Sequence, residues 1–284
     1  MEKLNSKYGR LFLRVSLSLL ALYFVFTRID SRELLRIVAT THLGWLSLGL
    51  FLYNLSKILS SFRLQYYFRD NGVSLSMKNN LVLYYIGMFY NLFLPGGIGG
   101  DTYKVWLLRQ NESASTKNLV QSVLFDRLSG MVLLCALSFV LGWVAFPNIP
   151  YRHALLAGAA TSLPVFYLIN YTMAKRFLAS FPMTSLLSCG VQGLQVLCAW
   201  AILAGLGVNE HTLVYITVFL ISSVVAVLPI SVGGIGIREL VFVAAAGIWP
   251  ISKDVSVAFS FLFFLLTALS SFPGGMISLP SLKK

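Results

Sequence analysis

The stretch NLFLPGGIGGD, Asn91–Asp101, closes an apolar run with a proline, four glycines and a carboxylate. A second stretch, VLPISVGGIGIRE (Val227–Glu239), repeats this order: Leu-Pro ends an apolar run, and a Gly-Gly pair follows four and five residues after the proline. Proline removes a backbone N–H and blocks a helical turn, and glycine tolerates backbone conformations that other residues avoid. Each motif therefore predicts a helix that breaks and restarts beside ionisable residues.

The composition places these breaks in a membrane protein. The 284-residue chain is 57% hydrophobic and only 11% charged, whereas a soluble domain carries about 25% charged residues. The apolar run Leu11–Phe26 lacks a small-residue cleavage site, so we interpret it as a span of the mature chain rather than as a signal peptide. We therefore expect a single integral membrane domain over residues 1–284.

The net charge of +12 fits the same class of protein. Basic residues lie between the apolar runs, as in loops that orient a membrane protein and contact anionic headgroups. No RNA- or DNA-binding motif is present, so we expect no nucleic-acid partner. The three cysteines lie inside apolar segments without metal-ligand spacing, and the three histidines are scattered at span ends. We therefore expect neither a metal site nor a cofactor.

Apolar runs of about 20 residues predict transmembrane helices. The chain reads as an all-α, polytopic transmembrane helical bundle. Its full spans and shorter helical segments are predicted at 11–27, 43–62, 79–94, 102–109, 119–146, 154–173, 186–206, 212–228, 236–249 and 255–279. The segment Arg28–Ala39 reads as a short interfacial helix, with Asp30 or Ser31 as its N-cap.

Basic residues near the outer spans predict the orientation, because cytoplasmic loops are enriched in lysine and arginine. They place both termini in the cytoplasm, although three arginines in the connection 28–36 oppose this assignment. The conflict is reduced if segment 79–109 enters and leaves from the inside, and segment 212–249 enters and leaves from the outside. This gives about six full spans plus two re-entrant broken-helix hairpins in an inverted repeat. The alternative is eight or more spans, with the motifs as ordinary loops.

Paired broken helices in the two halves of a chain are a pointer to a transporter's substrate site. The N-terminal ends of half-helices carry unpaired N–H groups and partial positive charge, which suit a phosphate. The other interpretation is that the motifs are only tight loops. The helix-break residues are Pro95, Gly96, Gly97, Gly99, Gly100, Pro229, Gly233, Gly234 and Gly236.

Ionisable side chains in or against the apolar runs add to the case for a site. A charge at the bilayer centre costs about 2.5–3.5 kcal/mol on insertion scales, so these groups should pair or face a polar cavity. The candidate substrate-binding residues are Lys57, Asn91, Asp101, Lys104, Arg109, Asp126, Arg127, Arg238 and Glu239. We expect Asp101, Arg127, Arg238 and Glu239 to converge on one polar cavity. Internal salt bridges such as Arg127 with Glu239 or Arg238 with Asp101, and inner-interface positions for Asp126 and Arg127, are the structural alternatives.

Catalysis has little support in the sequence. No Ser-His-Asp pattern, P-loop, HExxH or aspartate-rich metal motif is present. Asp101 and Glu239 would make an acid–base pair, but the sequence supplies no nucleophile or metal to act with them. We therefore expect a protein that is not an enzyme.

Three blocks, NLFLPGGIGGDTYKVWLLR, FDRLSG and LPISVGGIGIREL, resemble the lysylphosphatidylglycerol synthase transmembrane-region family, also called flippase-like domain or UPF0104 proteins. The blocks occur in the family's order, and the resemblance covers nearly the whole chain. It implies a lipid-flipping membrane region whose motif positions include the helix-break residues, Asp101, Asp126, Arg127, Arg238 and Glu239. Full-length synthases carry a soluble catalytic domain after this region, whereas the chain ends at Lys284, so we expect no synthase activity.

Motifs and resemblance together predict a flippase-like protein of the cytoplasmic (inner) membrane. It would translocate or bind a lipid with a phosphate headgroup, either a phospholipid or a polyprenyl-phosphate lipid. The first alternative is a non-transporting accessory protein that presents lipid to an enzyme, and the second is an intramembrane glycosyl- or aminoacyltransferase. A homo-oligomer and a lipid-modifying enzyme stay open as protein partners.

Overall fold

The computed structural model describes residue 36 and residues 39–93, 99–111, 115–227 and 237–277. The chain forms two compact units, Met1–Thr41 and His42–Lys284, and each is described by itself. In the first unit the Thr40 hydroxyl donates a hydrogen bond to the Arg36 carbonyl at 2.9 Å, one helical turn back. The predicted first span and nearly all of the predicted interfacial helix lie outside the described residues.

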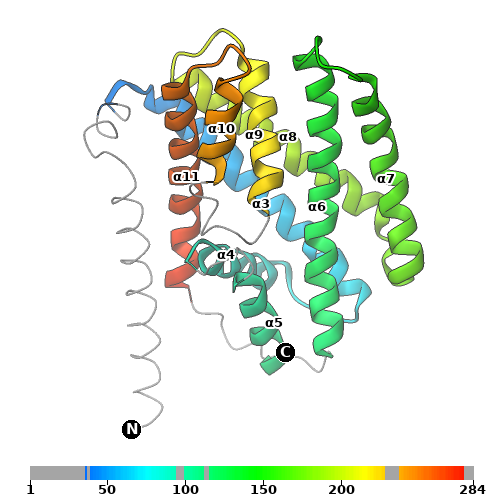
Figure 1. Cartoon of the computed structure of the whole chain (residues 1–284). Coiled ribbons are helices and arrows are strands. Elements are labelled where there is room, and N and C mark those ends of the chain that lie inside the picture. Colours follow the sequence, from blue (N-terminus) through cyan, green and yellow to red (C-terminus); the bar gives the residue numbers. More distant parts are fainter. Residues whose placement is uncertain (1–35, 37–38, 94–98, 112–114, 228–236, 278–284) are drawn as a thin grey trace. The chain divides into compact units, whose positions relative to one another are not determined.

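The second unit, His42–Lys284, confirms the predicted all-α fold, since its described elements are all helical (Figure 1). Within the described ranges these are α3 (Leu43–Asp70), α4 (Met77–Phe93), α5 (Gly99–Asn111), α6 (Thr116–Ala145), α7 (His153–Met173), the 3-10 turn η2 (Lys175–Phe177), α8 (Phe181–Gly205), α9 (Thr212–Ala226), α10 (Ile237–Ala246) and α11 (Lys253–Met276).

Four described helices, α6, α7, α8 and α11, are long and apolar enough to cross a membrane. Helix α3 has 28 residues, which corresponds to about 42 Å, but Lys57 and Arg63 lie within it. The sequence prediction ended this span at Phe62, whereas the helix continues to Asp70. It continues because Leu64, Tyr67 and Phe68, three and four residues apart, are all buried on one face.

Helices α4 and α5 form an antiparallel pair. The Asn91 side-chain oxygen, near the end of α4, accepts a hydrogen bond from the Gly100 N–H in the first turn of α5 at 2.8 Å. Farther from this turn, the Lys104 ammonium of α5 lies 4.5 Å from the centroid of the Tyr84 ring of α4. Later residues of α5 therefore meet earlier residues of α4, as in a hairpin.

Helices α9 and α10 form a second antiparallel pair. Arg238, at the start of α10, donates from Nη1 to the Ser223 hydroxyl near the end of α9 at 3.2 Å. At the other end of the pair, the N–H of Ser252, in the connection from α10 to α11, donates to the Tyr215 hydroxyl in α9 at 2.8 Å. The two pairs are named here the first hairpin (α4–α5) and the second hairpin (α9–α10).

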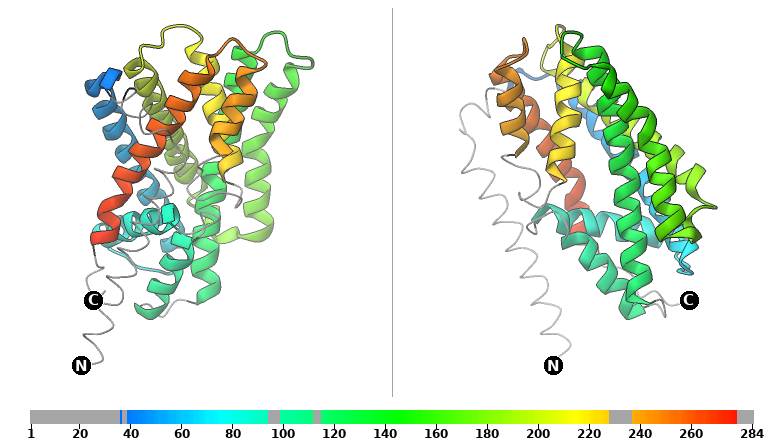
Figure 2. Two further views of the ribbon diagram at one scale, coloured as in Figure 1. Left: turned by 60° about the vertical axis from the view of Figure 1, so that its left-hand side comes forward. Right: turned by 45° about the vertical axis from the view of Figure 1, so that its right-hand side comes forward.

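The outer ends of the two hairpins lie at opposite ends of α6 (Figures 1 and 2). Near the start of α6, the Asn71 amide, just before α4, donates to the Asn118 carbonyl at 2.9 Å. At the far end of α6, Phe146 stacks on Trp249, which lies between α10 and α11, with ring centroids 4.2 Å apart. This is the opposite-facing arrangement that the two motifs predicted.

The helices of both hairpins are short. Helices α4 and α9, the longer members, have 17 and 15 residues, or about 26 and 23 Å of helix, against a hydrocarbon thickness of about 30 Å. Their antiparallel pairing and their length favour re-entrant hairpins over two pairs of full spans.

Helix α11 contacts both hairpins. Near its start, Phe259 packs on Phe242 of α10, with ring centroids 5.3 Å apart. Near its end, Gly274 lies so close to the Tyr85 carbonyl of α4 that a side chain at this glycine would collide with it. This helix therefore positions the two hairpins against one another inside the second unit.

Candidate functional site

A buried carboxylate at the start of α5 binds two cations. Asp101 Oδ1 accepts from the Lys104 ammonium at 3.1 Å, and Asp101 Oδ2 pairs with Arg127 Nε of α6. The Asp101 and Lys104 side chains are buried, with 9% and 5% of their surfaces exposed, whereas Arg127 keeps 32% exposed. These three residues are called the Asp101 cluster below, and their formal charges sum to +1.

The first glycine break explains how Asp101 reaches this position. Gly99 and Gly100 begin α5, and a carboxylate in the first turn of a helix is stabilised by the helix dipole. A side chain at Gly100 would collide with the Gly87 carbonyl of α4, so glycine permits the close approach of the two helices. Asn91 accepts from the Gly100 N–H, and its oxygen also lies 3.5 Å from Arg127 Nη2.

Lys104 is held from the opposite side by α4. Its ammonium lies 4.5 Å from the Tyr84 ring centroid, a cation–π contact. Its aliphatic chain passes against Gly87, where any larger residue would collide with it. The first hairpin thus fixes both Asp101 and Lys104 before α6 contributes Arg127.

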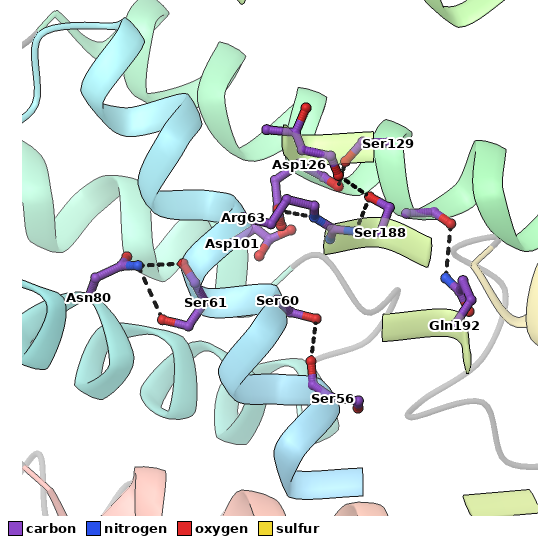
Figure 3. A network of polar contacts seen from close by, with 12 residues as sticks. Ser56, Ser60, Ser61, Arg63, Asn80, Asp101, Asp126, Ser129, Ser188 and Gln192 are labelled. Carbon is purple, nitrogen blue, oxygen red and sulfur yellow. Dashed lines mark hydrogen bonds and ion pairs between the residues drawn. The ribbon is translucent and has the colours of Figure 1, made fainter. Parts of the chain in front are cut away.

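A second buried ion pair lies beside the Asp101 cluster. Arg63 Nε of α3 donates to Asp126 Oδ1 of α6 at 2.7 Å, and Arg63 Nη1 donates to the Ser188 hydroxyl of α8 at 2.9 Å. Figure 3 shows Asp101 near this pair, as expected because Arg127 follows Asp126 in α6. The pair joins three helices and fixes the part of α6 from which Arg127 extends.

Sequence analysis missed Arg63 as part of the site. It was placed at the end of a span because the prediction stopped the helix at Phe62, so its burial was not foreseen. Gly130, four residues after Asp126, leaves room for the Arg63 guanidinium, because a side chain there would crowd it. Tyr84, whose ring contacts Lys104, was missed because an aromatic residue in an apolar run carries no distinguishing pattern.

The second hairpin holds its ionisable residues differently. The Arg238 guanidinium lies 4.5 Å from the Phe263 ring centroid and 5.2 Å from the Phe219 ring centroid, in addition to its bond to Ser223. Glu239 Oε1 accepts from the Ser260 hydroxyl of α11 at 3.0 Å. Both residues are half-buried in the first turn of α10.

The predicted site residues therefore fall into two groups. The structure brings Asn91, Asp101, Lys104 and Arg127 together, next to Asp126. Arg238 and Glu239 lie with α9 and α11, and their convergence with Asp101 on one cavity stays a prediction. In the described residues Asp101 pairs with Lys104 and Arg127, whereas Arg238 bonds to Ser223.

Two further predicted residues, Arg109 and Lys57, lie on α5 and α3, and most of the helix-break residues lie outside the described ranges. Arg109 is exposed in the last turn of α5, about 12 Å of helical rise from Asp101. Lys57 of α3 has its ammonium 4.5 Å from the Tyr53 ring centroid. The helix-break residues outside the described ranges are Pro95, Gly96, Gly97, Pro229, Gly233, Gly234 and Gly236.

The described part of the chain contains no set of side chains that could bind a metal ion. No group of three or more His, Cys, Asp or Glu residues gathers there, and the three cysteines do not form disulfides. Instead, the described residues place cationic side chains between helices, where they pair with carboxylates or lie over aromatic rings. This arrangement can bind an anion but supplies no evident nucleophile.

Fold and site together define a polytopic α-helical membrane protein with two opposed helical hairpins and buried cations. Compared with known protein families, residues 11–274 match the lysylphosphatidylglycerol synthase TM region family, and the chain belongs to that family. A search of curated proteins found no match. The chain is thus an integral membrane protein of a family linked to lipid handling.

Proposed function

We propose that this protein binds a lipid through its phosphate headgroup and moves that headgroup across the membrane. One observation carries the proposal: the Asp101 cluster has two cations for one carboxylate, and one of them, Arg127, keeps a third of its side chain exposed. The exposed part of the Arg127 guanidinium can donate charge-assisted hydrogen bonds to an anion that reaches it. Membership in the lysylphosphatidylglycerol synthase TM region family supports a lipid as the source of that anion.

The surrounding residues would prepare Arg127 for phosphate. Asp101 and Asn91 orient the guanidinium, and a planar guanidinium can donate two parallel hydrogen bonds to phosphate oxygens. Lys104 remains on the other oxygen of Asp101, so the carboxylate stays paired when Arg127 turns toward a headgroup. Hairpins that open at opposite ends of the bundle would give the headgroup an approach from either leaflet.

Transport by reconstituted protein tests this proposal. Proteoliposomes carrying fluorescent phosphatidylglycerol in both leaflets would be treated with dithionite, which bleaches only the outer leaflet. We expect the protected fraction to fall below one half with the protein present, and Arg127→Gln to slow the exchange by at least about tenfold, a barrier change near 1.4 kcal/mol. Arg69→Gln is a control, because Arg69 is exposed over the Tyr66 ring, outside the cluster.

The outcomes separate the alternative functions. Lipid binding without exchange would overturn transport and favour an accessory protein that presents lipid to an enzyme. A changed headgroup, detected by mass spectrometry of the recovered lipid, would favour a transferase and overturn our proposal that the chain does no headgroup chemistry. Exchange at the rate of protein-free vesicles, without lipid binding, would overturn both lipid functions.

We also propose that the α6 N-terminal end of the bundle faces the cytoplasm of the inner membrane. The basic residues at this end are Arg69, Lys78, Arg109, Lys117, Lys175 and Arg176. Arg176 bonds there to the side-chain oxygens of Asn71 and Asn118, at 2.5 and 3.3 Å. At the opposite end, Arg152 and Lys253 are accompanied by Glu210 and Asp254, so lysine and arginine favour the first end as cytoplasmic.

A further inference from the structure

Lys57 is a cation without a carboxylate partner in the described part of the chain. Its ammonium lies 4.5 Å from the centroid of the Tyr53 ring, one turn earlier in α3. The described ion pairs join Asp101 and Asp126 to other cations and leave Lys57 out. A ring face compensates a cation only partly, and a charge within an apolar span is costly.

The position of Lys57 links the two hairpins. It lies close enough to Tyr84, Arg63 and Arg238 to interact with them electrostatically. On one side, the Tyr84 ring carries the Lys104 ammonium of the Asp101 cluster. Three residues before Lys57, the Asn54 side-chain oxygen accepts from the Tyr85 hydroxyl of α4 at 2.8 Å, so this part of α3 contacts the first hairpin.

On its other side, Lys57 reaches the second hairpin through a pair of rings. Tyr53 packs edge-to-face on Phe263 of α11, with centroids 5.8 Å apart, and the Arg238 guanidinium lies 4.5 Å from the Phe263 centroid. Lys57 and Arg238 thus lie at the two ends of one aromatic pair. Both side chains are half-buried.

We propose that Lys57 is a phosphate-binding residue midway between the Asp101 cluster and Arg238. A headgroup that leaves Arg127 would be taken by Lys57 and passed to Arg238, so that a cation accompanies the phosphate between the hairpins. A lysine suits this step because its compact charge sits on a flexible stem, whereas the arginines at either end are held by several contacts. The transfer role rests on the proposed lipid transport, but phosphate binding at Lys57 does not.

The chain offers a matched control for this proposal. Lys175 lies with its ammonium 4.9 Å from the ring centroid of Tyr171, four residues earlier, as Lys57 lies over Tyr53. Lys175 is exposed at the first position of η2 and belongs to neither cation group. Lys57→Met and Lys175→Met therefore remove the same charge from the same kind of ring contact at two different places.

In the dithionite assay we expect Lys57→Met to slow phosphatidylglycerol exchange by at least about tenfold, Lys57→Arg to retain most of the rate, and Lys175→Met to match the wild type. Exchange by Lys57→Met at the wild-type rate would overturn the proposal. A loss shared equally by Lys175→Met would also overturn it.

A binding measurement tests Lys57 even if the wild type moves no lipid. Purified protein in detergent would be titrated with dihexanoyl phosphatidylglycerol and, separately, with inorganic phosphate. Weaker binding of either by Lys57→Met than by Lys175→Met supports the phosphate site. If Lys57→Met weakens the binding of phosphatidylglycerol more, the natural ligand is a lipid headgroup. If it weakens the binding of inorganic phosphate more, the natural ligand is free phosphate. Equal affinities of the two variants for both ligands would overturn the proposed phosphate site. Absence of binding of either ligand by the wild type and both variants would also overturn it.

Discussion

The two hairpins share a sequence pattern but manage their charges in different ways. In the first, Asp101 follows the glycine pair directly, and the carboxylate lies in the first turn of α5, where the helix dipole favours it. In the second, Arg238 lies in the first turn of α10, where the dipole disfavours a cation. Its described interactions are with the Ser223 hydroxyl, two phenylalanine rings and, electrostatically, the neighbouring Glu239 carboxylate.

Because of this difference, the two hairpins would have different roles in the proposed lipid transport. The Asp101 cluster is preorganised, because carboxylate, lysine and arginine fix one another before any ligand arrives. Arg238 is held by weaker contacts, so it gains more from an anion. Under the proposed lipid transport, the first hairpin would select the headgroup and the second would take it up or release it.

The largest effect is expected from the ion pair that supports the first hairpin. Asp126→Asn would leave the buried Arg63 guanidinium without its carboxylate, and breaking a buried pair by removing one partner costs about 3–5 kcal/mol. We expect a strongly lowered thermal unfolding midpoint in detergent, together with loss of lipid exchange. Ser188→Ala, which removes only a hydroxyl partner of Arg63, should lower the midpoint far less. An unchanged midpoint in Asp126→Asn would show that the pair is not a support.

A smaller but specific effect is expected at the glycine contact inside the first hairpin. Gly100→Ala would push α5 away from the Gly87 carbonyl, and overpacking of this kind costs about 1–3 kcal/mol. We expect reduced lipid exchange with membrane insertion preserved, measured on equal amounts of purified protein. Gly193→Ala is the matched control, because nothing lies near an added methyl group there. Equal activity of both variants would mean that the first break is an ordinary loop.

Much of the fold was readable from the sequence because helical spans leave long apolar runs. The ranges 119–146, 154–173 and 255–279 correspond closely to α6, α7 and α11. The structure also shows serine caps that the prediction did not use: the Ser115 and Ser252 hydroxyls accept from the Asn118 and Val255 N–H groups at the starts of α6 and α11.

The site was only partly readable, because ion pairing depends on contacts between distant segments. The glycine motif indicates Asp101, the apolar setting indicates Arg127, and the two are expected to converge, but the sequence does not specify that they pair with one another. The neighbours of Arg63 in the sequence are basic and aromatic, a pattern typical of a membrane interface. Its burial against Asp126 depends on the packing of α3 on α6 and α8. No local pattern could supply that information.

The second hairpin should show graded losses. Arg238→Lys keeps the charge but loses the planar group that stacks on Phe263 and Phe219, and Arg238→Gln also loses the charge. We expect exchange rates in the order wild type, Lys, Gln, with the folded fraction in size-exclusion chromatography unchanged. If Arg238→Gln moves lipid as fast as the wild type, the second hairpin does not contact the headgroup.

The orientation of the protein in the membrane can be tested by cysteine labelling, in variants that are expected to keep their activity. In a background without the native cysteines, a cysteine at Lys117 should be labelled only from the cytoplasmic side, and a cysteine at Glu210 only from outside. The reason is the excess of lysine and arginine at the α6 N-terminal end. Labelling of position 117 from outside by an impermeant maleimide would reverse the proposed topology.

The most direct test of the Asp101 cluster is a structure of the protein in nanodiscs that contain phosphatidylglycerol. We predict a lipid phosphate within hydrogen-bond distance of the Arg127 guanidinium, with Asp101 still paired to Lys104. A cluster in which Arg127 contacts only protein groups, while every resolved headgroup lies at the bilayer surface, would contradict the assignment of this site to lipid phosphate.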